Sequence, residues 1–269
     1  MHDVRKIGRR TWLARMTGGA VAVWTSLGLS GCGGTWSVSI GEPVVSGNVD
    51  FGDGIRRVPL GQNGFTTSYI VVRRGEAAIV DTGVSGSGQR IGKVLREAGL
   101  GWDAVRHLIV THHHGDHAGS VAEVLGQATK ATVWAGAADI PSIRSPREIQ
   151  AAEDGADIFG LQIIATPGHT LGHVAVYDRA ASTFITGDAL SNVGGSLAGS
   201  SPQYTADMTQ AQASVKKIAA LGFEKALFMH GDPIEKGAAA EIGKLALALP
   251  NDAAMLAQVL DAEGTCGHG

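Results

Sequence analysis

The sequence predicts a single α/β domain built around a mixed β-sheet. From about residue 68 onward, short apolar runs typical of strands alternate with amphipathic segments typical of helices. Several strands follow one another too closely for a helical crossover, so some neighbouring strands must be antiparallel. The 269 residues, of which 44% are hydrophobic and 17% charged, are enough to bury a substantial core.

The first predicted elements are a β-hairpin and a helix. Residues 68–72 and 77–81 are short apolar runs separated by Arg73-Arg74-Gly75-Glu76, the pattern of two strands joined by a turn. Apolar side chains then recur at helical spacing between residues 91 and 98, and Gly99 supplies a stop signal. A buried strand is expected next, at residues 107–110.

The second half of the chain continues this alternation. The expected elements are a helix at 118–125, strands at 131–134 and 162–165, a hairpin at 173–177 and 183–186, a helix at 206–221, a strand at 225–229 and a closing helix at 235–249. Between residues 191 and 200, glycines among serines favour a mobile flap beside Asp188.

The first 31 residues are interpreted as an export signal. A basic start containing the pair Arg9-Arg10 precedes a weakly apolar stretch at 16–29, an order that resembles a twin-arginine signal. That stretch is shorter and richer in glycine than the roughly 20 apolar residues of a permanent membrane helix. Leu29-Ser30-Gly31-Cys32 resembles the lipobox of bacterial lipoproteins, which makes Cys32 the expected lipidation site.

These signals predict three parts and a location. Residues 1–31 are the export signal, residues 32–48 are the lipidated cysteine with a flexible tether, and residues 49–269 are the folded domain. The protein is therefore expected to be exported, in the periplasm or on the outer surface, and attached to a membrane by its N-terminal lipid.

The charge of the mature chain excludes one class of partner. Removing residues 1–31 takes away five basic and one acidic side chain, which moves the formal net charge from -3 to -7. An acidic domain is a poor match for nucleic acid, whose binding depends on clustered Lys and Arg. With Cys32 acylated, Cys266 has no partner for an internal disulfide. A small-molecule substrate is the expected partner.

The motif His112-x-His114-x-Asp116-His117 follows the strand predicted at 107–110. Three imidazoles and a carboxylate within six residues are donors that suit zinc and its first-row neighbours. Neither strand nor helix periodicity would bring all four donors together, so the motif is expected on a loop. Chance rarely places four such donors at this spacing in a chain with ten histidines.

This motif resembles the H-x-H-x-D-H signature of the metallo-β-lactamase superfamily. The resemblance extends over about residues 49–250 and includes Val80-Asp81-Thr82-Gly83, Thr166-Pro167-Gly168-His169-Thr170, Thr186-Gly187-Asp188 and Met229-His230-Gly231-Asp232. It implies a four-layer αββα sandwich, in which two mixed β-sheets are flanked by helices.

The resemblance also implies a ligand set for two divalent metal ions. One ion would be held by His112, His114 and His169, and the other by Asp116, His117 and His230, with Asp188 between them. Zinc is the expected metal, with iron and manganese as alternatives. Asp116 would also be catalytic, steering the nucleophile or accepting its proton. Asp81 would orient an imidazole from outside the ligand set, although a turn cap is the alternative for Asp81.

Four other residues have weaker interpretations. His113 occupies a variable position of the motif and is expected to point away from the metals, while His107 is expected in the core. His173 would support the ligands or the fold. Tyr204 could contact substrate or simply pack at the surface.

The ligand set favours one branch of the superfamily. His114 argues against the di-iron redox members, and Asp188 argues against typical zinc β-lactamases, which carry Cys or Ser there. The set most resembles glyoxalase II and the lactonases, which implies hydrolysis of a small ester, thioester, lactone or amide by a metal-activated hydroxide. The alternatives are a mononuclear iron persulfide dioxygenase, a β-lactamase and a non-catalytic periplasmic metal-binding lipoprotein.

Overall fold

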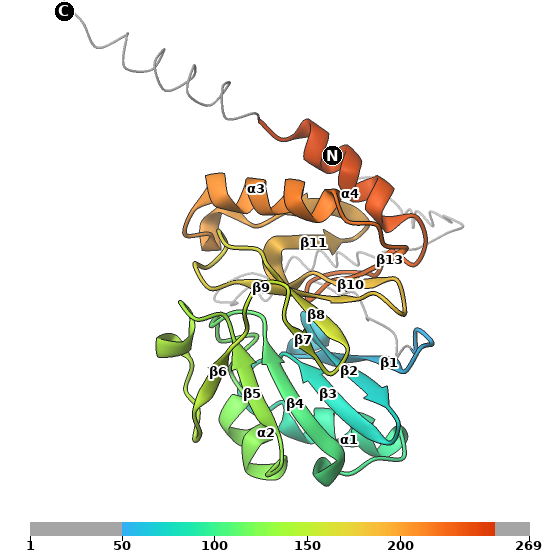
Figure 1. Cartoon of the computed structure of the whole chain (residues 1–269), viewed down its shortest axis with the longest axis vertical. Coiled ribbons are helices and arrows are strands. Elements are labelled where there is room, and N and C mark those ends of the chain that lie inside the picture. The colour runs from blue at the N-terminus through green and yellow to red at the C-terminus, as the bar shows by residue number, and fades with distance from the viewer. Residues whose placement is uncertain (1–49, 251–269) are drawn as a thin grey trace, which may run out of the picture. The chain divides into compact units, whose positions relative to one another are not determined.

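The computed structural model describes residues 50–250, which form two β-sheets packed face to face with helices on both outer sides (Figure 1). The four-layer αββα sandwich expected from the resemblance is therefore confirmed. The export signal predicted at 1–31, the lipidation site Cys32 and the tether up to residue 48 lie outside the described residues. Within residues 50–250, no helix has the length and apolar character needed to cross a membrane.

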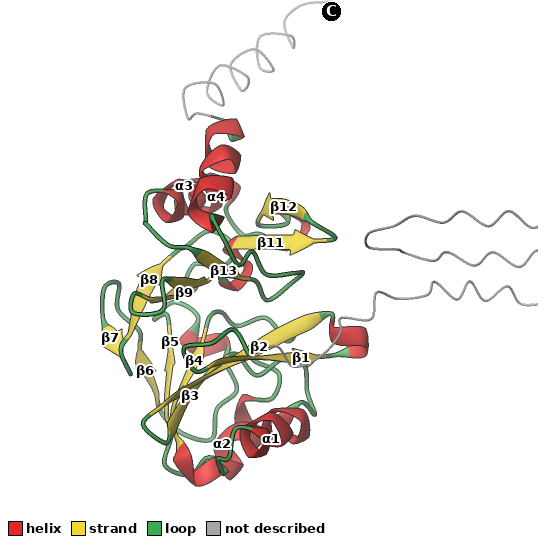
Figure 2. Cartoon of the chain, turned by 90° about the vertical axis from the view of Figure 1, so that its right-hand side faces the viewer, coloured by secondary structure: helices red, strands yellow, loops and turns green. Residues whose placement is uncertain are grey.

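The first sheet has six strands in the order β1-β2-β3-β4-β5-β6. Neighbours are antiparallel from β1 to β3 and parallel from β3 to β6. The strands are β1 (Ile55–Leu60), β2 (Thr66–Arg73), β3 (Glu76–Val80), β4 (Val105–Val110), β5 (Thr132–Ala135) and β6 (Ile149–Ala151). Helices α1 (Gly88–Glu97) and α2 (Val121–Gln127) lie in the crossovers and cover the outer face of this sheet (Figures 1 and 2).

The second sheet has five strands in the order β13-β10-β9-β8-β7. Only the pair β10 and β13 is parallel. The strands are β7 (Asp157–Ile158), β8 (Leu161–Ala165), β9 (Val174–Asp178), β10 (Thr183–Ile185) and β13 (Lys225–Leu227). Helices α3 (Met208–Ala219) and α4 (Ala238–Ala248) pack on its outer face. A separate hairpin consists of β11 (Leu190–Val193) and β12 (Ser196–Gly199).

Short 3-10 helices occupy several of the connections. They are η1 (Gln62–Gly64), η2 (Trp102–Ala104), η3 (Ile140–Ser142), η4 (Gly187–Ala189) and η5 (Pro202–Tyr204). The helix η4 carries Asp188, and η1 ends beside Phe65. Both therefore belong to the part of the fold that surrounds the predicted ligands.

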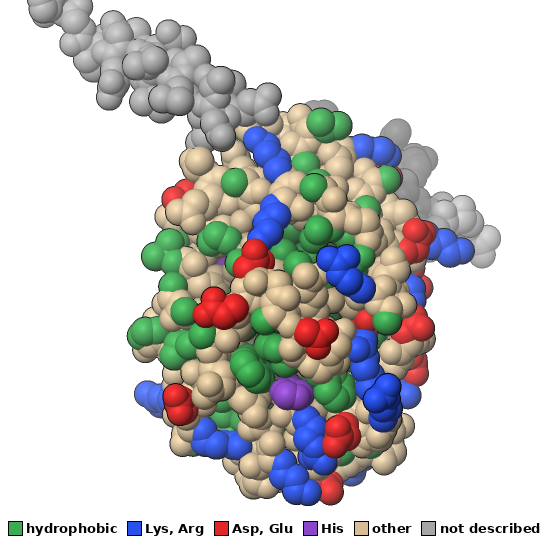
Figure 3. All heavy atoms as spheres, in the orientation of Figure 1, with side chains coloured by type: hydrophobic (Ala, Val, Ile, Leu, Met, Phe, Trp, Pro, Cys, Tyr) green, Lys and Arg blue, Asp and Glu red, His purple; other side chains and the backbone are tan. Residues whose placement is uncertain are grey.

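Three apolar layers explain why the strands are continuous hydrophobic runs. In β4, Leu108 and Val110 pack toward α1 and α2, whereas Ile109 packs between the two sheets. In β8, Ile163 faces the space between the sheets and Ile164 faces the layer under α3 and α4. Because both faces of these strands are buried, alternation of polar and apolar residues is absent. The surface, by contrast, is a mixture of charged, polar and scattered apolar side chains (Figure 3).

Most predicted elements are confirmed, with shifts at their ends. Helix α3 begins at Met208 because the Asp207 side chain accepts a hydrogen bond from the backbone of Gln210 at 3.0 Å and caps the helix. Helix α2 begins at Val121, three residues later than expected, because residues 114–120 form turns that present the ligands. In the segment 191–200, where a mobile flap is expected, β11 and β12 pair as a hairpin, and the mobility of this segment stays a prediction.

Candidate metal centre

The predicted ligands lie on loops that leave the carboxyl ends of strands. The motif 111–117 follows β4, residues 166–173 follow β8, Asp188 follows β10 and His230 follows β13. Strands β10 and β13 are parallel neighbours, and β8 runs in the same direction as β10 because two antiparallel steps separate them. Their ends therefore meet at one edge of the second sheet, opposite the end of β4 in the first.

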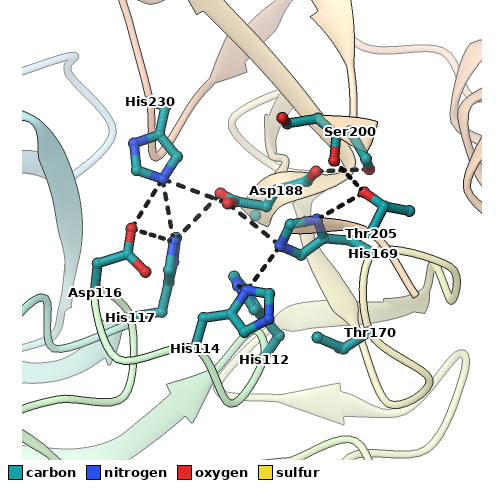
Figure 4. A network of polar contacts seen from close by, with 12 residues as sticks. His112, His114, Asp116, His117, His169, Thr170, Asp188, Ser200, Thr205 and His230 are labelled. Atoms are coloured by element: carbon teal, nitrogen blue, oxygen red, sulfur yellow. Dashed lines mark hydrogen bonds and ion pairs between the residues drawn. The ribbon is translucent and has the colours of Figure 1, made fainter. Parts of the chain in front are cut away.

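All seven predicted ligands converge in one cluster (Figure 4). Three groups of donors have all their ligand atoms within 4.8 Å of one another. These groups are His112, His114 and His169; His112, His117 and Asp188; and Asp116, His117 and His230. Two of the groups are the two triads expected from the sequence, and the third connects them through Asp188.

The spacing of the donor atoms fits metal coordination. His114 Nδ1 lies 3.1 Å from His112 Nε2 and 3.0 Å from His169 Nε2, while His117 Nε2 lies 3.3 Å from His230 Nε2. Tetrahedral zinc with bonds of about 2.0–2.1 Å would place neighbouring donors roughly 3.3 Å apart. The imidazole nitrogens thus already have the separations that a bound ion requires.

Asp188 reaches both triads. Its Oδ2 lies 3.5 Å from His169 Nε2 and 3.4 Å from His230 Nε2, and its Oδ1 lies 3.4 Å from His117 Nε2. Oδ1 is buried and has no hydrogen-bond partner among the described residues. A buried carboxylate oxygen without a donor is costly unless a cation faces it, so the donor set fits a metal.

Hydrogen bonds on the far sides of the rings turn the ligating nitrogens inward. His230 Nδ1 lies 2.9 Å from the Phe65 carbonyl oxygen, which can only accept, so this nitrogen carries the proton. The Thr205 hydroxyl donates to the Ser201 carbonyl at 2.6 Å and can accept from His169 Nδ1 at 3.3 Å. In the neutral form of both rings, Nε2 carries no proton and can bind a cation.

Asp81 organises the motif loop from beneath. It is fully buried, its Oδ1 accepts from the Thr111 backbone at 2.7 Å, and its Oδ2 accepts from the Thr111 hydroxyl at 2.7 Å. The same Oδ2 lies 2.8 Å from His117 Nδ1. The Thr111 hydroxyl in turn lies 3.1 Å from His112 Nδ1. Asp81 therefore contacts His117 directly and His112 through Thr111, one residue of each predicted triad.

The charged groups of the cluster shift one another's pKa values. Burial raises the pKa of Asp116 and of Asp188, but the neighbouring histidines, above all His117 and then His230, outweigh burial and hold both well below their usual range. Burial lowers the pKa of His230, yet Asp116 and Asp188 together raise it to about 9. At His169, burial dominates and lowers the pKa to about 4. Without metal, protons on His117 and His230 offset the carboxylates, so a divalent cation would displace protons as it binds.

The three other described histidines and Tyr204 lie outside the donor groups. His113 belongs to none of the donor groups and its Nδ1 lies 3.0 Å from Asp139. His173 supports the site, because its Nε2 accepts from the Asp188 backbone at 2.9 Å. His107, partly buried, accepts from the Trp134 indole at 3.1 Å. Tyr204 is 61% exposed, which agrees with both of its interpretations.

Sequence reasoning missed Asp139, which joins two ligand loops. This buried carboxylate follows β5 and accepts hydrogen bonds from the His113 backbone at 3.0 Å, the Thr170 hydroxyl at 2.6 Å and the Gly172 backbone at 2.8 Å. It thereby ties the loop of His112 and His114 to the loop of His169. A single aspartate after a strand carries no motif, so only the fold reveals this contact.

Asn192 and Arg57 were also missed, and both hold the His230 loop. The Asn192 backbone donates to the His230 carbonyl at 3.0 Å, and its side-chain amide donates to the Asp232 carbonyl at 2.8 Å. Arg57, buried on β1, donates to the Gly231 carbonyl at 2.7 Å. The strand β1 was not predicted because two arginines interrupt its apolar pattern.

A cavity of about 360 Å³ lies apart from this cluster. It is lined by the β11–β12 hairpin, residues 200–202, helix α3 and Leu249, and by none of the seven predicted ligands. Its wall includes Ser200. The Ser200 hydroxyl also donates a hydrogen bond to the backbone carbonyl of Asp188 at 2.8 Å (Figure 4).

Sequence comparison finds relatives along this part of the chain. The model of the family described as the metallo-beta-lactamase superfamily matches residues 61–230. The hydroxyacylglutathione hydrolase of Methylobacillus flagellatus is 36% identical over 130 residues, which cover 47% of this chain and 48% of that protein. The corresponding enzyme of Pseudomonas entomophila is 33% identical over 154 residues, 51% of this chain and 57% of that protein. The chain spans about half the length of these curated relatives.

Solved structures of related proteins have the same fold. A metallo-beta-lactamase family protein from Thermus thermophilus superposes with a TM-score of 0.59 at 22% identity, over 72% of this chain and 78% of that chain. The protein TTHA1623, described in a di-iron-bound form, gives a TM-score of 0.57 at 25% identity over 71% of this chain and 96% of its own. The chain therefore belongs to the metallo-β-lactamase superfamily and is related in sequence to hydroxyacylglutathione hydrolases.

Proposed function

We propose that the protein is a metal-dependent hydrolase that cleaves a small ester, thioester or lactone. The observation that carries this proposal is the convergence of seven nitrogen and oxygen donors into overlapping groups at one edge of the sandwich. The names of the related hydroxyacylglutathione hydrolases favour a thioester as the first class to test.

The donors divide between two ions as the motif implies. His112, His114 and His169 would hold one, Asp116, His117 and His230 the other, and the two oxygens of Asp188 face both sets. Two divalent ions held by these residues would lower the pKa of a bound water toward neutrality and would polarise a substrate carbonyl. Zinc suits these donors, and iron is the second candidate because TTHA1623 is described with two irons.

Asp116 is proposed as the residue that handles the proton of the attacking water. Its Oδ2 points at the second set of donors, 3.3 Å from His230 Nε2 and 3.5 Å from His117 Nε2 (Figure 4). Its side chain is 28% exposed, so a molecule bound at the donors can reach it. The low pKa of Asp116 keeps the carboxylate ionised at neutral pH, so it can orient the water by accepting a hydrogen bond.

Metal depletion followed by a substrate panel tests this function. The full chain, stripped with a chelator and reloaded with zinc, should bind two equivalents and regain hydrolysis of at least one class among esters, thioesters and lactones. His112→Ala should abolish this activity. His107→Gln is the matched control, since it removes a histidine outside the cluster while keeping an acceptor for Trp134.

Each alternative predicts a different result. Activity that ignores both chelation and His112→Ala would defeat the proposal. One equivalent of iron with oxygen consumption on persulfides would indicate a dioxygenase, and turnover confined to β-lactams would indicate a β-lactamase. A fully metallated protein that turns over nothing in the panel would indicate a non-catalytic metal-binding role.

The location of the protein is a separate proposal from the sequence. Export and acylation of Cys32 stay predictions, because these residues lie outside the described part of the chain. Mass spectrometry of the membrane fraction tests them directly. Protein recovered without a lipid on Cys32 would remove the anchor and leave the proposed chemistry untouched.

A further inference from the structure

The segment that carries His230 is held by the first β-sheet, although it belongs to the second. In the described part of the chain, residues 228–231 follow β13 and form hydrogen bonds with the β1–β2 hairpin (residues 55–73). The contacts come from the Tyr69 side chain, the Phe65 carbonyl and the Arg57 side chain. One ligand of the second metal therefore depends on how the two sheets pack together.

Tyr69 holds the segment just before His230. Its side chain is fully buried between the sheets, and its hydroxyl donates to the Phe228 carbonyl at 2.6 Å. Burial raises the pKa of Tyr69, so the hydroxyl keeps its proton at neutral pH and can donate it. Because Phe228 is fully buried as well, its carbonyl has no access to bulk water in place of this donor.

Arg57 holds the segment just after His230. It lies directly opposite Tyr69 in the register of β1 and β2, so both side chains are on the same face of the sheet. It is 3% exposed, and its guanidinium donates to the Gly231 carbonyl at 2.7 Å and lies 3.9 Å from the Asp232 carboxylate. The two side chains thus grip the backbone on either side of the ligand.

Residues 65 and 66 of the β1–β2 hairpin contact two ligands of the second set. The Phe65 carbonyl lies 2.9 Å from His230 Nδ1, and the two ring centroids are 4.7 Å apart. The Thr66 hydroxyl donates to the Asp116 carbonyl at 3.2 Å. Figure 4 shows the side chains of His230 and Asp116 facing each other, with 3.3 Å between Nε2 and Oδ2.

The first set of donors has other supports. Thr111 contacts His112, Thr205 contacts His169, and Asp139 joins the two loops of this set. Among residues 50–250, no hydrogen bond or ion pair joins the β1–β2 hairpin to any of the three histidines of the first set. The β1–β2 hairpin is therefore in direct contact with the second set alone.

We propose that Arg57 and Tyr69 are positioning residues that set the affinity of the second metal ion and leave that of the first unchanged. This inference rests on the two-ion site of the proposed function and adds that different parts of the fold support the two ions. When only a fraction of molecules has a ligand in the competent position, the apparent affinity falls by that fraction. By holding the backbone around His230, the two side chains keep that fraction high before a metal binds.

Charge and positioning predict opposite results for Arg57. A buried cation beside the site repels a divalent ion, so removal of the charge alone would tighten metal binding. Loss of the hydrogen bond to Gly231 would instead free the segment and weaken binding. Tyr69→Phe removes one donor without a change of charge, so this variant measures positioning by itself.

Zinc titration of variants that keep one set of donors tests the inference. In the full chain, His230→Ala leaves the first set intact and His112→Ala leaves the second. In the His112→Ala background, Arg57→Met should lower zinc affinity about 10- to 100-fold. Tyr69→Phe should lower it about 3- to 10-fold. In the His230→Ala background, neither change should alter zinc affinity by more than about twofold.

The chain offers a matched control for each variant. Arg56 points to the opposite face of β1 and pairs with Asp50 at 3.0 Å, so Arg56→Met removes an arginine that does not touch the segment. The buried hydroxyl of Tyr177 donates to the Gly222 carbonyl, so Tyr177→Phe removes a tyrosine hydroxyl elsewhere. Neither control should change zinc affinity in either background.

Two further measurements separate positioning from stability. Urea unfolding of each metal-free variant shows whether it is folded. Cobalt absorption of the chain with both donor sets, titrated in two steps, gives the answer even if a single-set background is unstable. There Arg57→Met and Tyr69→Phe should weaken one of the two binding steps and leave the other, with its absorption spectrum, unchanged.

The outcomes distinguish this inference from the function on which it rests. Equal losses for both donor sets, or unchanged or tighter zinc binding by either variant in the His112→Ala background, would overturn the positioning role alone. Selective loss at the second set, in a protein that hydrolyses no ester, thioester or lactone, would overturn the proposed function and leave the positioning role standing. A wild-type chain that binds no zinc would overturn both.

Discussion

Asp81 Oδ2 lies 2.8 Å from His117 Nδ1, and both side chains are fully buried. The contact joins the end of β3 to the motif loop after β4, since Asp81 also takes two hydrogen bonds from Thr111. It leaves Nε2 of His117 directed at the other donors of its triad. Asp81 accepts a backbone φ of 62° to make these contacts, a left-handed conformation that few residues other than glycine adopt.

Asp81→Asn should weaken metal binding about 10- to 100-fold. Asparagine tolerates a left-handed φ, so the backbone is kept. Its amide offers one acceptor oxygen where the carboxylate offers two, so either Thr111 or His117 loses its partner. Competition with a chromophoric chelator measures the affinity. Asp53→Asn is the matched control, because Asp53 also has a positive φ, of 52°, but is exposed; equal affinities of the two variants would contradict this role.

Zinc should stabilise the protein strongly against denaturant. A metal that binds only the folded state at a thousandfold its Kd contributes about 4 kcal/mol per site. The displacement of protons from His117 and His230 should make this gain larger at higher pH. Urea midpoints with and without zinc measure it, and magnesium, which prefers oxygen ligands, should have little effect. An unchanged midpoint with saturating zinc would count against the dinuclear site.

Asp139→Asn should weaken the connection between the loop of His112 and His114 and the loop of His169. The carboxylate accepts from both loops, and replacing one oxygen with an amide leaves at least one buried donor unpaired, at a cost of about 1–3 kcal/mol. Affinity for the first zinc should fall more than affinity for the second. Asp154→Asn, a more exposed aspartate that pairs with Lys217, should change stability by no more than about 0.5 kcal/mol. Equal losses at both zinc sites would argue for general destabilisation.

The stability that Asp139 contributes should decrease at acid pH. Burial raises the pKa of Asp139, but hydrogen bonds from Thr170, Gly172 and His113 outweigh it and lower the pKa below its usual range. A depressed pKa in the folded state stabilises the protein above the unfolded value of about 3.9 and loses that contribution as the pH falls through the folded value. The stability gap between the wild type and Asp139→Asn should thus be full above about pH 4 and shrink below it. Urea titrations over a pH series that extends from neutrality to below that point measure the gap, and a constant gap would contradict the assignment.

The candidate ligands could be predicted from the sequence because few residue types bind such metals. Clustered His and Asp after strand ends are rare, and each landmark from His112 to His230 is a short local pattern. The structure then places these landmarks in one cluster. The strand β1 escaped prediction because Arg56 and Arg57 hide its period, and the buried Arg57 has its hydrogen-bond partner in a loop 174 residues away.

The supporting residues could not be read from local patterns. Asp139 and Asn192 act through backbone groups of segments that are distant in sequence, so only the tertiary fold defines their partners. Glycines and serines between residues 191 and 200 resemble those of an unpaired loop, yet Leu190 to Val193 find strand partners in Ser196 to Gly199. Positive-φ glycines at 194 and 195 form the turn of that hairpin.

Gly231→Ala should weaken zinc binding, whereas Gly195→Ala should not. Both glycines have a positive φ, of 103° and 78°, so alanine is strained at either position. A Cβ at Gly231 would lie 2.1 Å from the Asn192 carbonyl oxygen, whereas one at Gly195 meets nothing within 4 Å. The clash forces apart the loop and the hairpin that together hold His230. Gly195→Ala should therefore cost about 1 kcal/mol of stability with zinc affinity retained, and Gly231→Ala should cost more and also weaken zinc binding. Denaturant unfolding and zinc titration of both variants decide the matter, and equal zinc affinity for the two would show that the hairpin does not position His230.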